Sequence, residues 1–229
     1  MSRTRSKLKS LFGSPVGKKY LTGITGIALA VFVLEHMLGN LEFLASDAAY
    51  NEYSHFLFSF GPILYVIEII LLLFLVVHMV LGVNIWLGKR RARNRGYLKF
   101  ESAGEPSRQT ISSRSMILTG IILGVFLVIH LDSFKYGAYY EVTIDGVVMR
   151  DLATLMREKF QNPAYAFGYP LAVILLGFHL RHGVWSAFQS LGATRPTVTP
   201  VIYTIGTLFA IAIAVGFLYV PLAIYFGLV

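Results

Sequence analysis

The chain has 229 residues, of which 55% are hydrophobic and only 14% are charged, whereas a soluble domain usually has roughly 25% charged residues. It contains no cysteine, which excludes disulfides, thiolate zinc sites and cysteine-ligated iron–sulfur clusters within this chain. The net charge of +8 could suggest nucleic acid, but the basic residues follow the positive-inside pattern of membrane proteins instead.

The apolar residues form blocks long enough to cross a bilayer, which takes about 20 residues of helix. The blocks are Tyr20–Leu44, Pro62–Gly88, Ser115–Phe134, Ala164–Leu191 and Val201–Val229. We therefore predict an all-α integral membrane protein, a bundle of five transmembrane helices. A basic segment, residues 1–19, precedes this domain, residues 20–229. The first block is too long for a signal-peptide core and shows no cleavage site, so we expect it to be retained.

The basic residues predict the orientation. Residues 1–19 carry six basic and no acidic side chains, and the connection 89–108 is again strongly basic. With both in the cytoplasm, 16 of the 20 Lys and Arg residues lie at or near the inner side, as the positive-inside rule requires. Five crossings then place the C-terminus outside. The expected location of the protein is the bacterial cytoplasmic membrane.

The first block contains small residues, Gly23, Gly26 and Ala30, which indicate close helix packing. Residues 42–56 read as an acidic outer loop in which His55 is solvated. The second block begins at Pro62, a position where proline is tolerated.

In the outer connection 135–162 we expect a short hairpin followed by an amphipathic turn of helix. Pro170 is expected to kink the fourth helix. The fifth block has no charged residue and no histidine, which indicates a packing or lipid-facing element.

The other four blocks each carry a deep histidine: His36, His78, His130 and His179. Such groups are costly in a bilayer and indicate a function. With a rise of about 1.5 Å per residue, His36 and His130 lie roughly 25 Å from the inner face, and His78 and His179 roughly 24 Å from the outer face. In a core about 30 Å thick, this predicts an outer pair, His36 with His130, and an inner pair, His78 with His179.

Two histidines from different helices at matched depth can ligate one haem iron from both sides. Ligation needs neutral imidazoles whose other ring nitrogen meets an acceptor. The alternative is a hydrogen bond between helices, which is the more common role of a single intramembrane histidine. Four histidines paired by depth favour haem.

Cationic groups could neutralise the haem propionates, and the candidates are Arg181, His182, Lys89 and Arg114. His182 also competes with His179 as the inner ligand, because residues three apart share a helix face. Depth favours His179, and we place His182 at the propionates or the inner interface.

The segments around the histidines resemble one family. They are LEHMLGN (34–40), VVHMVLGVNIW (76–86), VIHLDSF (128–134) and FHLRHGVWSAFQSLG (178–192). Together they are similar to the single-anchor, di-haem cytochrome b subunit of succinate:quinone oxidoreductases, a family shared with fumarate reductases. The resemblance spans nearly the whole chain, and the order of five helices agrees with it.

The resemblance implies two haems b, with His36 and His130 as iron ligands of the outer haem and His78 and His179 of the inner one. It also implies partners. An iron–sulfur subunit, which carries a flavoprotein that oxidises succinate, would supply electrons, and a quinone, by resemblance menaquinone, would receive them. The chain has no dinucleotide fingerprint, so it is not expected to oxidise succinate itself.

Some family members carry an acidic residue elsewhere in the second helix, linked to quinol oxidation. Here the buried acid is Glu68, which could serve a quinone, a proton path, or only a hydrogen bond within the bundle. Two other functions stay open: a His and Glu proton-relay transporter or channel using His36, Glu68 and Arg181, and the haem subunit of another dehydrogenase or hydrogenase complex. The expected surroundings are membrane lipid and no nucleic acid.

Overall fold

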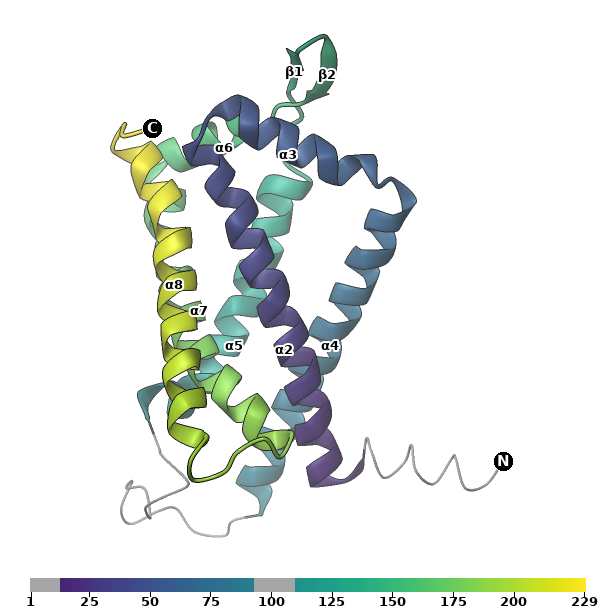
Figure 1. The fold of residues 1–229 in the computed structure, drawn as a ribbon, viewed down its shortest axis with the longest axis vertical. Helices are drawn as coiled ribbons and strands as arrows, with labels where there is room; N and C mark the ends of the chain where they lie inside the picture. Colours follow the sequence, from purple (N-terminus) through teal and green to yellow (C-terminus); the bar gives the residue numbers. More distant parts are fainter. Residues whose placement is uncertain (1–12, 93–109) are drawn as a thin grey trace. The chain divides into compact units, whose positions relative to one another are not determined.

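The computed structural model describes residues 13–92 and 110–229. Much of the predicted basic inner surface, residues 1–12 and 93–109, therefore lies outside the described residues. The long helices are α2 (Pro15–Leu41), α4 (Pro62–Arg91), α5 (Ile111–His130), α7 (Pro163–Ser190) and α8 (Thr199–Tyr225), as Figure 1 shows. Each is long and apolar enough to cross a membrane. The prediction of an all-α membrane protein with five spanning helices is confirmed.

The shorter elements connect these helices. They are a 3-10 turn, η1 (Glu42–Leu44), the helices α3 (Asp47–Ser59) and α6 (Leu152–Gln161), a π-helical turn, η2 (Leu131–Lys135), and the strands β1 (Glu141–Ile144) and β2 (Val147–Arg150). Proline occupies the first position of α2, α4 and α7, where its missing N–H removes no helix hydrogen bond. Helix α7 continues through Pro170.

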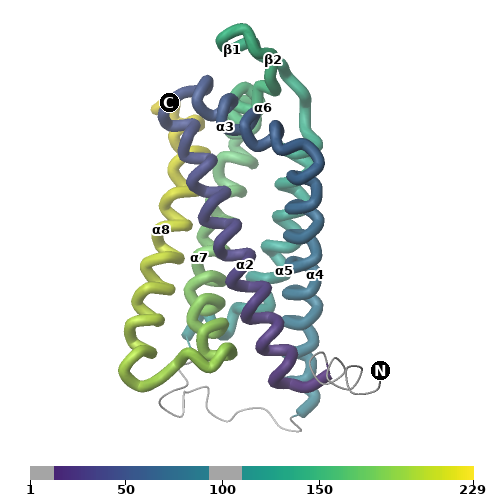
Figure 2. Tube along the Cα trace, turned by 45° about the vertical axis from the view of Figure 1, so that its right-hand side comes forward, coloured from purple at the N-terminus to yellow at the C-terminus, as the bar shows by residue number. Residues whose placement is uncertain are grey.

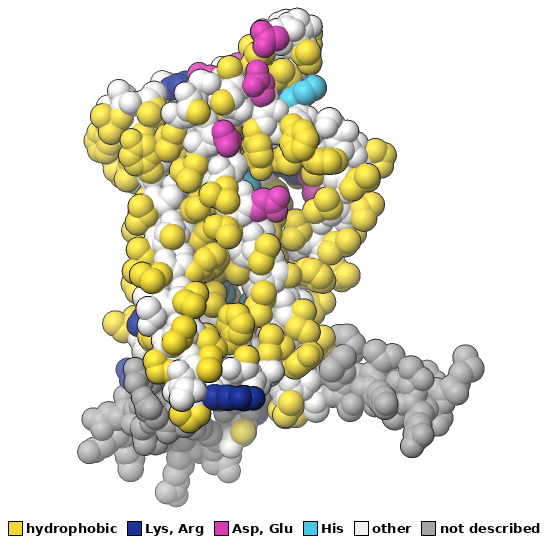
Figure 3. Space-filling view, viewed as in Figure 1, with side chains coloured by type: hydrophobic (Ala, Val, Ile, Leu, Met, Phe, Trp, Pro, Cys, Tyr) yellow, Lys and Arg dark blue, Asp and Glu magenta, His cyan; other side chains and the backbone are white. Residues whose placement is uncertain are grey.

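On the face that Figure 3 shows, hydrophobic side chains cover much of the surface along the helices. On α4, for example, Ile69 is 65% exposed and Leu73 58%. Apolar surface of this extent is unfavourable in water and suits contact with lipid. Helix α8 has both properties expected of it, because Ile213 is fully buried and Leu208 is 61% exposed.

The chain divides into two compact units. Unit 1 comprises Met1–Val31, Ile70–Gly120 and Phe178–Phe209, and unit 2 comprises Phe32–Ile69, Ile121–Gly177 and Ala210–Val229. Each of the five long helices contributes one part of its length to unit 1 and the other part to unit 2.

In unit 1, small residues let the helices approach one another, as predicted for α2. A Cβ added to Gly23 would lie 3.4 Å from the carbonyl oxygen of Ala187 on α7. A Cβ on Gly206 of α8 would lie 3.3 Å from the Val184 side chain of α7. Packing of this kind replaces the hydrophobic effect as the driving force between helices in lipid.

Unit 2 has an apolar core that combines the long helices with their connections. The buried cluster consists of Phe43, Ala153, Met156, Phe160, Tyr169, Val220 and Ile224. It joins η1, α6, α7 and α8, so the short helix α6 is anchored by its apolar face rather than by its weak intrinsic stability.

The predicted hairpin and helix in residues 135–162 are confirmed. Strands β1 and β2 pair antiparallel, with Glu141 opposite Arg150 and Ile144 opposite Val147. The turn between them places Asp145 and Gly146 at positive φ, 48° and 78°, as a two-residue hairpin turn of this hand requires. Helix α6 follows directly.

The prediction of a solvated loop at residues 42–56 is wrong in one respect, because most of it is helical. Ser46 caps α3 by accepting a hydrogen bond from the Ala49 N–H at 3.0 Å, a common start signal for a helix. His55 is exposed on α3, so its predicted solvation is confirmed. Helices α3 and α6 lie beside each other in Figures 1 and 2, and Asn51 of α3 bonds to the first residues of α6.

Candidate functional site

Each compact unit contains one pair of the predicted histidines. In unit 1, the ring centroids of His78 (α4) and His179 (α7) are 6.3 Å apart. In unit 2, the ring centroids of His36 (α2) and His130 (α5) are 5.6 Å apart. The depth argument therefore paired the four histidines as the structure does.

These separations suit one metal ion between two imidazoles. Metal–nitrogen bonds of about 2 Å on both sides put the two ring centres roughly 6 Å apart. Among the residues that the structure describes, no group of three or more His, Cys, Asp or Glu side chains could hold a metal ion. The arrangement fits a cofactor that supplies its remaining ligands itself, as haem does.

In unit 1, threonines of neighbouring helices set the tautomer of both imidazoles. His78 Nδ1 donates to the carbonyl oxygen of Thr22 at 3.1 Å and lies 3.4 Å from Thr25 Oγ1. His179 Nδ1 lies 3.1 Å from Thr119 Oγ1, whose hydroxyl donates to the Ser115 carbonyl at 3.0 Å and so accepts from the imidazole. With the proton on Nδ1, the lone pair of Nε2 is free to ligate iron.

A glycine beside each threonine makes room for the same two rings. A Cβ on Gly26 would lie 3.0 Å from His78 Cε1, and a Cβ on Gly120 would lie 3.4 Å from His179 Cε1. Sequence reasoning missed these threonines and explained the glycine in α2 only by packing. The dipeptide Thr-Gly occurs at residues 22–23, 25–26 and 119–120, and the glycines of the last two face the histidines.

In unit 2, the histidine pair has apolar and aromatic surroundings. His36 stacks on Phe32 at 5.6 Å and lies 5.8 Å from Phe217, measured between ring centroids. The amide Nδ2 of Asn40 lies 3.5 Å from His36 Nε2. His36 is half-buried and its ring neighbours are mostly apolar.

His130 is enclosed by three aromatic rings, those of Phe126, Phe134 and Tyr169, at centroid distances of 5.9, 5.5 and 6.0 Å. Its Nδ1 is buried and has no hydrogen-bond partner within residues 13–92 and 110–229. Within these residues His130 Nδ1 therefore lacks an acceptor of the kind that the Thr22 carbonyl and the Thr119 hydroxyl provide in unit 1. The histidines of unit 1 fit haem in spacing and in hydrogen bonding, and those of unit 2 fit it in spacing and in their aromatic surroundings.

All four predicted propionate partners belong to unit 1, together with His78 and His179. Arg181 donates to Tyr203 Oη at 3.0 Å and to Ser112 Oγ at 3.4 Å. His182 is half-buried with its ring 6.1 Å from that of Trp185. Lys89 and Arg114 are exposed at the ends of α4 and α5. Arg181 is thus held by two hydroxyl groups of unit 1, and His182 lies beside an aromatic ring rather than in the histidine pair.

Glu68 on α4 forms an ion pair with Lys135 at the end of η2, in unit 2. Both side chains are about one third exposed, 36% for Glu68 and 34% for Lys135. Sequence reasoning left open whether Glu68 serves a quinone, a proton path or a structural bond. The structure identifies Lys135 as the ion-pair partner of Glu68, which the sequence did not.

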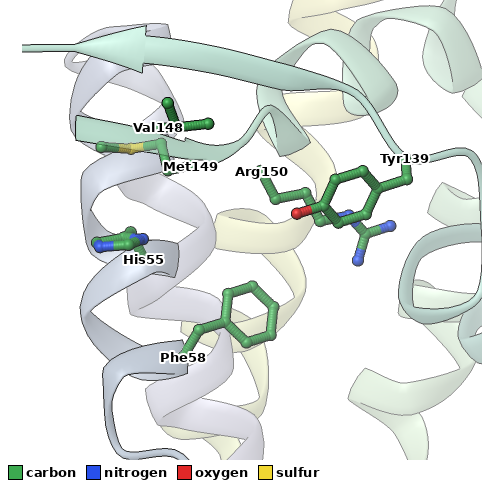
Figure 4. A pocket seen from close by; sticks show the side chains of 6 residues that line it. All are labelled: His55, Phe58, Tyr139, Val148, Met149 and Arg150. Atoms are coloured by element: carbon green, nitrogen blue, oxygen red, sulfur yellow. The ribbon is translucent and has the colours of Figure 1, made fainter. Parts of the chain in front are cut away.

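Unit 2 also contains a hollow of about 310 Å³ that no sequence pattern indicated. Figure 4 shows His55 and Phe58 from α3 and Val148 and Met149 from β2 on its walls, with Tyr139 beside Arg150. The guanidinium of Arg150 donates to backbone carbonyls of η2 and of the residues after it. Arg150 therefore stabilises the backbone beside the hollow.

Five helices long enough to cross a membrane and two interhelical histidine pairs are the features expected of a membrane-bound b-type cytochrome. Comparison with known proteins narrows the class. Over 206 residues the chain is 29% identical to the succinate dehydrogenase cytochrome b558 subunit of Bacillus subtilis (strain 168). The aligned residues cover 89% of this chain and 91% of that protein. The resemblance to the cytochrome b subunits of succinate dehydrogenases is confirmed. This resemblance and the five apolar helices agree with the predicted location, a multi-pass protein in the cytoplasmic membrane.

No family model matches the chain. No solved structure matches it either.

Proposed function

We propose that this chain is the membrane-anchor cytochrome b subunit of a succinate:quinone oxidoreductase, and that it binds two haems b and passes electrons from an iron–sulfur subunit to a quinone. The observation that carries the proposal is the pairing of four histidines into two interhelical sites, one in each compact unit. When bound, haem supplies the one-electron chemistry, and the protein tunes it through ligands, burial and hydrogen bonds.

The residues of this chain perform four tasks in the proposal. His78 and His179 present Nε2 because Thr22 and Thr119 hold the Nδ1 proton. Aromatic rings pack beside His36 and His130. Gly26 and Gly120 leave space for the imidazoles. Arg181 supplies a fixed positive charge in unit 1 for the propionates, with Lys89, Arg114 and His182 as further candidates.

The proposed partners are those implied by the family resemblance, and the charge of the chain supports them. A cytochrome b subunit of succinate dehydrogenase works with an iron–sulfur subunit and a flavoprotein, and this chain has no cysteine with which to hold a cluster. The basic residues of segments 1–19 and 89–99 would suit docking of the iron–sulfur subunit. Menaquinone is the proposed electron acceptor, and Glu68 is the proposed acidic residue for the quinone.

The proton-relay alternative relies on His36, Glu68 and Arg181 as ionisable groups within the spans, and His36 lies beside His130 in the pair of unit 2. In the structure Glu68 pairs with Lys135, and Arg181 donates to Ser112 and Tyr203. These partners explain the two charges without a relay. No specific observation favours this alternative or a subunit of another dehydrogenase.

A dithionite-reduced minus oxidised spectrum of the purified protein, with haem quantified per chain, tests the proposal. We expect two b-type haems, of which His36→Ala removes one and His179→Ala removes the other. His55→Ala is the matched control, because His55 is exposed on α3 and outside both pairs. Folded wild-type protein without haem would contradict the proposal, and one haem per chain would restrict it to a single pair.

A further inference from the structure

Helix α5 changes its geometry directly after the proposed ligand His130. The next five residues form the π-helical turn η2, Leu131–Lys135, which the Tyr136 N–H closes by donating to the Leu131 carbonyl at 2.9 Å. A π turn holds one more residue than an α turn, is rare, and is frequently found at functional sites. Something in unit 2 must therefore maintain it.

Phe134 connects this turn to the imidazole. Its ring lies 5.5 Å from the His130 ring and 5.7 Å from the Tyr169 ring, and Tyr169 in turn lies 6.0 Å from His130, measured between centroids. A change in the backbone of η2 therefore moves an aromatic wall of His130. Close-packed interiors transmit such shifts rather than absorb them.

Arg150 at the end of β2 holds the C-terminal part of the turn. Its guanidinium donates to the carbonyl oxygens of Phe134 at 3.0 Å, Lys135 at 3.3 Å and Ala138 at 3.3 Å. Carbonyls at a helix end have no partner within the helix. The planar, always charged fork of arginine can satisfy several of them in one fixed orientation.

Two further contacts confine the same turn. A Cβ on Gly137 would lie only 2.1 Å from the carbonyl oxygen of Ser133, so the chain passes so close to the turn that only glycine fits. The Ser133 hydroxyl donates to the Ile129 carbonyl at 2.6 Å and lies 3.2 Å from Tyr165 Oη. The side chain of Lys135 pairs with Glu68.

We propose that Arg150 is a positioning residue for the electron-transfer site in unit 2, and that it sets the orientation of His130 by holding the π turn η2. The inference rests on the proposed function, since it treats His130 as an iron ligand. The printed bonds of Arg150 go to backbone carbonyls and not to the His130 ring. It acts through the Phe134 carbonyl and ring, and the orientation of an axial imidazole is one of the means by which a protein tunes haem.

Two substitutions separate geometry from charge. Arg150→Lys keeps the charge but loses the fork that reaches three carbonyls. Gly137→Ala changes no charge and forces a Cβ against Ser133 of the same turn. Arg157→Lys is the matched control, because Arg157 belongs to the same unit and bonds to Asp47 and to the Val229 carbonyl instead.

The measurement is the midpoint potential and the low-spin electron paramagnetic resonance g values of each haem in the purified, haem-loaded protein. The two haems are assigned beforehand with the His36→Ala and His179→Ala variants. In Arg150→Lys and in Gly137→Ala, the haem assigned to His36 and His130 should shift in both quantities. The haem assigned to His78 and His179 should keep its wild-type values, and Arg157→Lys should leave both haems unchanged.

Wild-type values for both haems in Arg150→Lys would overturn the inference. Equal shifts of both haems, or loss of both, would also overturn it, because they would mean a general role in folding. A wild-type protein that binds no haem contradicts the proposed function itself and is recognised before any variant is made. The two failures are therefore distinguishable.

Discussion

The threonine that holds each imidazole of unit 1 is the smallest feature with a functional consequence. In Thr119→Val, the side chain keeps nearly its shape but cannot accept a hydrogen bond from His179 Nδ1. Loss of such a partner typically weakens metal binding about 10–100-fold. We expect the haem assigned to His78 and His179 to transfer faster to a haem-scavenging globin, while the other haem transfers at the wild-type rate.

Thr207→Val is the control for this experiment. Thr207 lies on α8 in the same unit and donates only to the Tyr203 carbonyl of its own helix, at 2.8 Å. If Thr207→Val accelerates haem transfer as much as Thr119→Val does, the effect belongs to helix packing and not to the imidazole.

The glycines beside these threonines lead to a second prediction at the residue scale. Gly26→Ala places a methyl group 3.0 Å from His78 Cε1, closer than ordinary van der Waals contact. The ring must shift by a few tenths of an ångström, so we expect the haem assigned to His78 and His179 to be held less tightly and the haem content to fall below two per chain. Gly82→Ala on α4 has no atom within 4 Å of its new Cβ and should keep both haems, as pyridine haemochrome spectra would show.

The sequence predicted the histidine ligands better than it predicted their supports. A histidine within an apolar block is conspicuous, and its depth can be counted along one helix. Thr119 is equally polar, but a hydroxyl within a helix usually bonds to its own backbone, as Thr119 also does with Ser115. Which threonine faces a histidine 60 residues away depends on helix rotation, which no count along the chain provides.

At the scale of elements, a side chain of α3 completes the N-terminal cap of α6. Asn51 of α3 is 2% exposed, and its Oδ1 accepts from the N–H groups of Leu152 and Ala153 at 2.9 and 3.0 Å. Its Nδ2 donates to Asp151 Oδ1 at 2.9 Å. Asn51→Leu would leave buried donors unsatisfied, which costs roughly 1–3 kcal/mol each. We expect faster hydrogen exchange throughout α6, whereas Glu52→Leu, on the exposed neighbour, should change it little.

Asp151 makes the same cap dependent on pH. Partial burial works to raise its pKa, but hydrogen bonds from the Thr154 hydroxyl and N–H, from Asn51 and from Ala153 prevail and lower it below its ordinary value. The stabilisation is therefore fully present above that ordinary value and is lost as the pH falls through the lower, folded pKa. A cap of this kind is typically worth about 1 kcal/mol.

Asp151→Asn separates the cap from its charge. Asparagine caps helices about as well as aspartate but does not titrate. We expect α6 in the variant to keep its hydrogen-exchange protection near neutral pH and to lose less of it than the wild type does in acid. Equal acid sensitivity of both proteins would assign the pH dependence to another group.

The long helices were predictable because a bilayer requires about 20 apolar residues in sequence, and the predicted ends lie within five residues of the observed ones. Helix α3 was not, because its thirteen residues mix acidic, aromatic and small side chains without a strong apolar stripe. Its stability comes from contacts such as Asn51 with α6, far away in the sequence. Tertiary contacts of this kind have no local pattern.

At the scale of the whole molecule, the two units differ in charge, although each contains one histidine pair. The ranges of unit 1 include 16 of the 20 Lys and Arg residues, and those of unit 2 include 10 of the 12 Asp and Glu residues. Each unit has one histidine pair. The basic ranges are expected to face the cytoplasm, because Lys and Arg near span ends are retained there during insertion.

Since the chain has no cysteine, single cysteines can report this orientation directly. Thr143→Cys lies exposed on β1, and Ala193→Cys lies exposed in the connection between α7 and α8. In intact cells, a membrane-impermeant maleimide should label Thr143→Cys at once and Ala193→Cys only after permeabilisation. Both variants must retain two haems, so that labelling reports the assembled protein. Labelling of Ala193→Cys in intact cells would reverse the predicted orientation and place the docking surface for the iron–sulfur subunit on the acidic side, where the charge argument gives it no support.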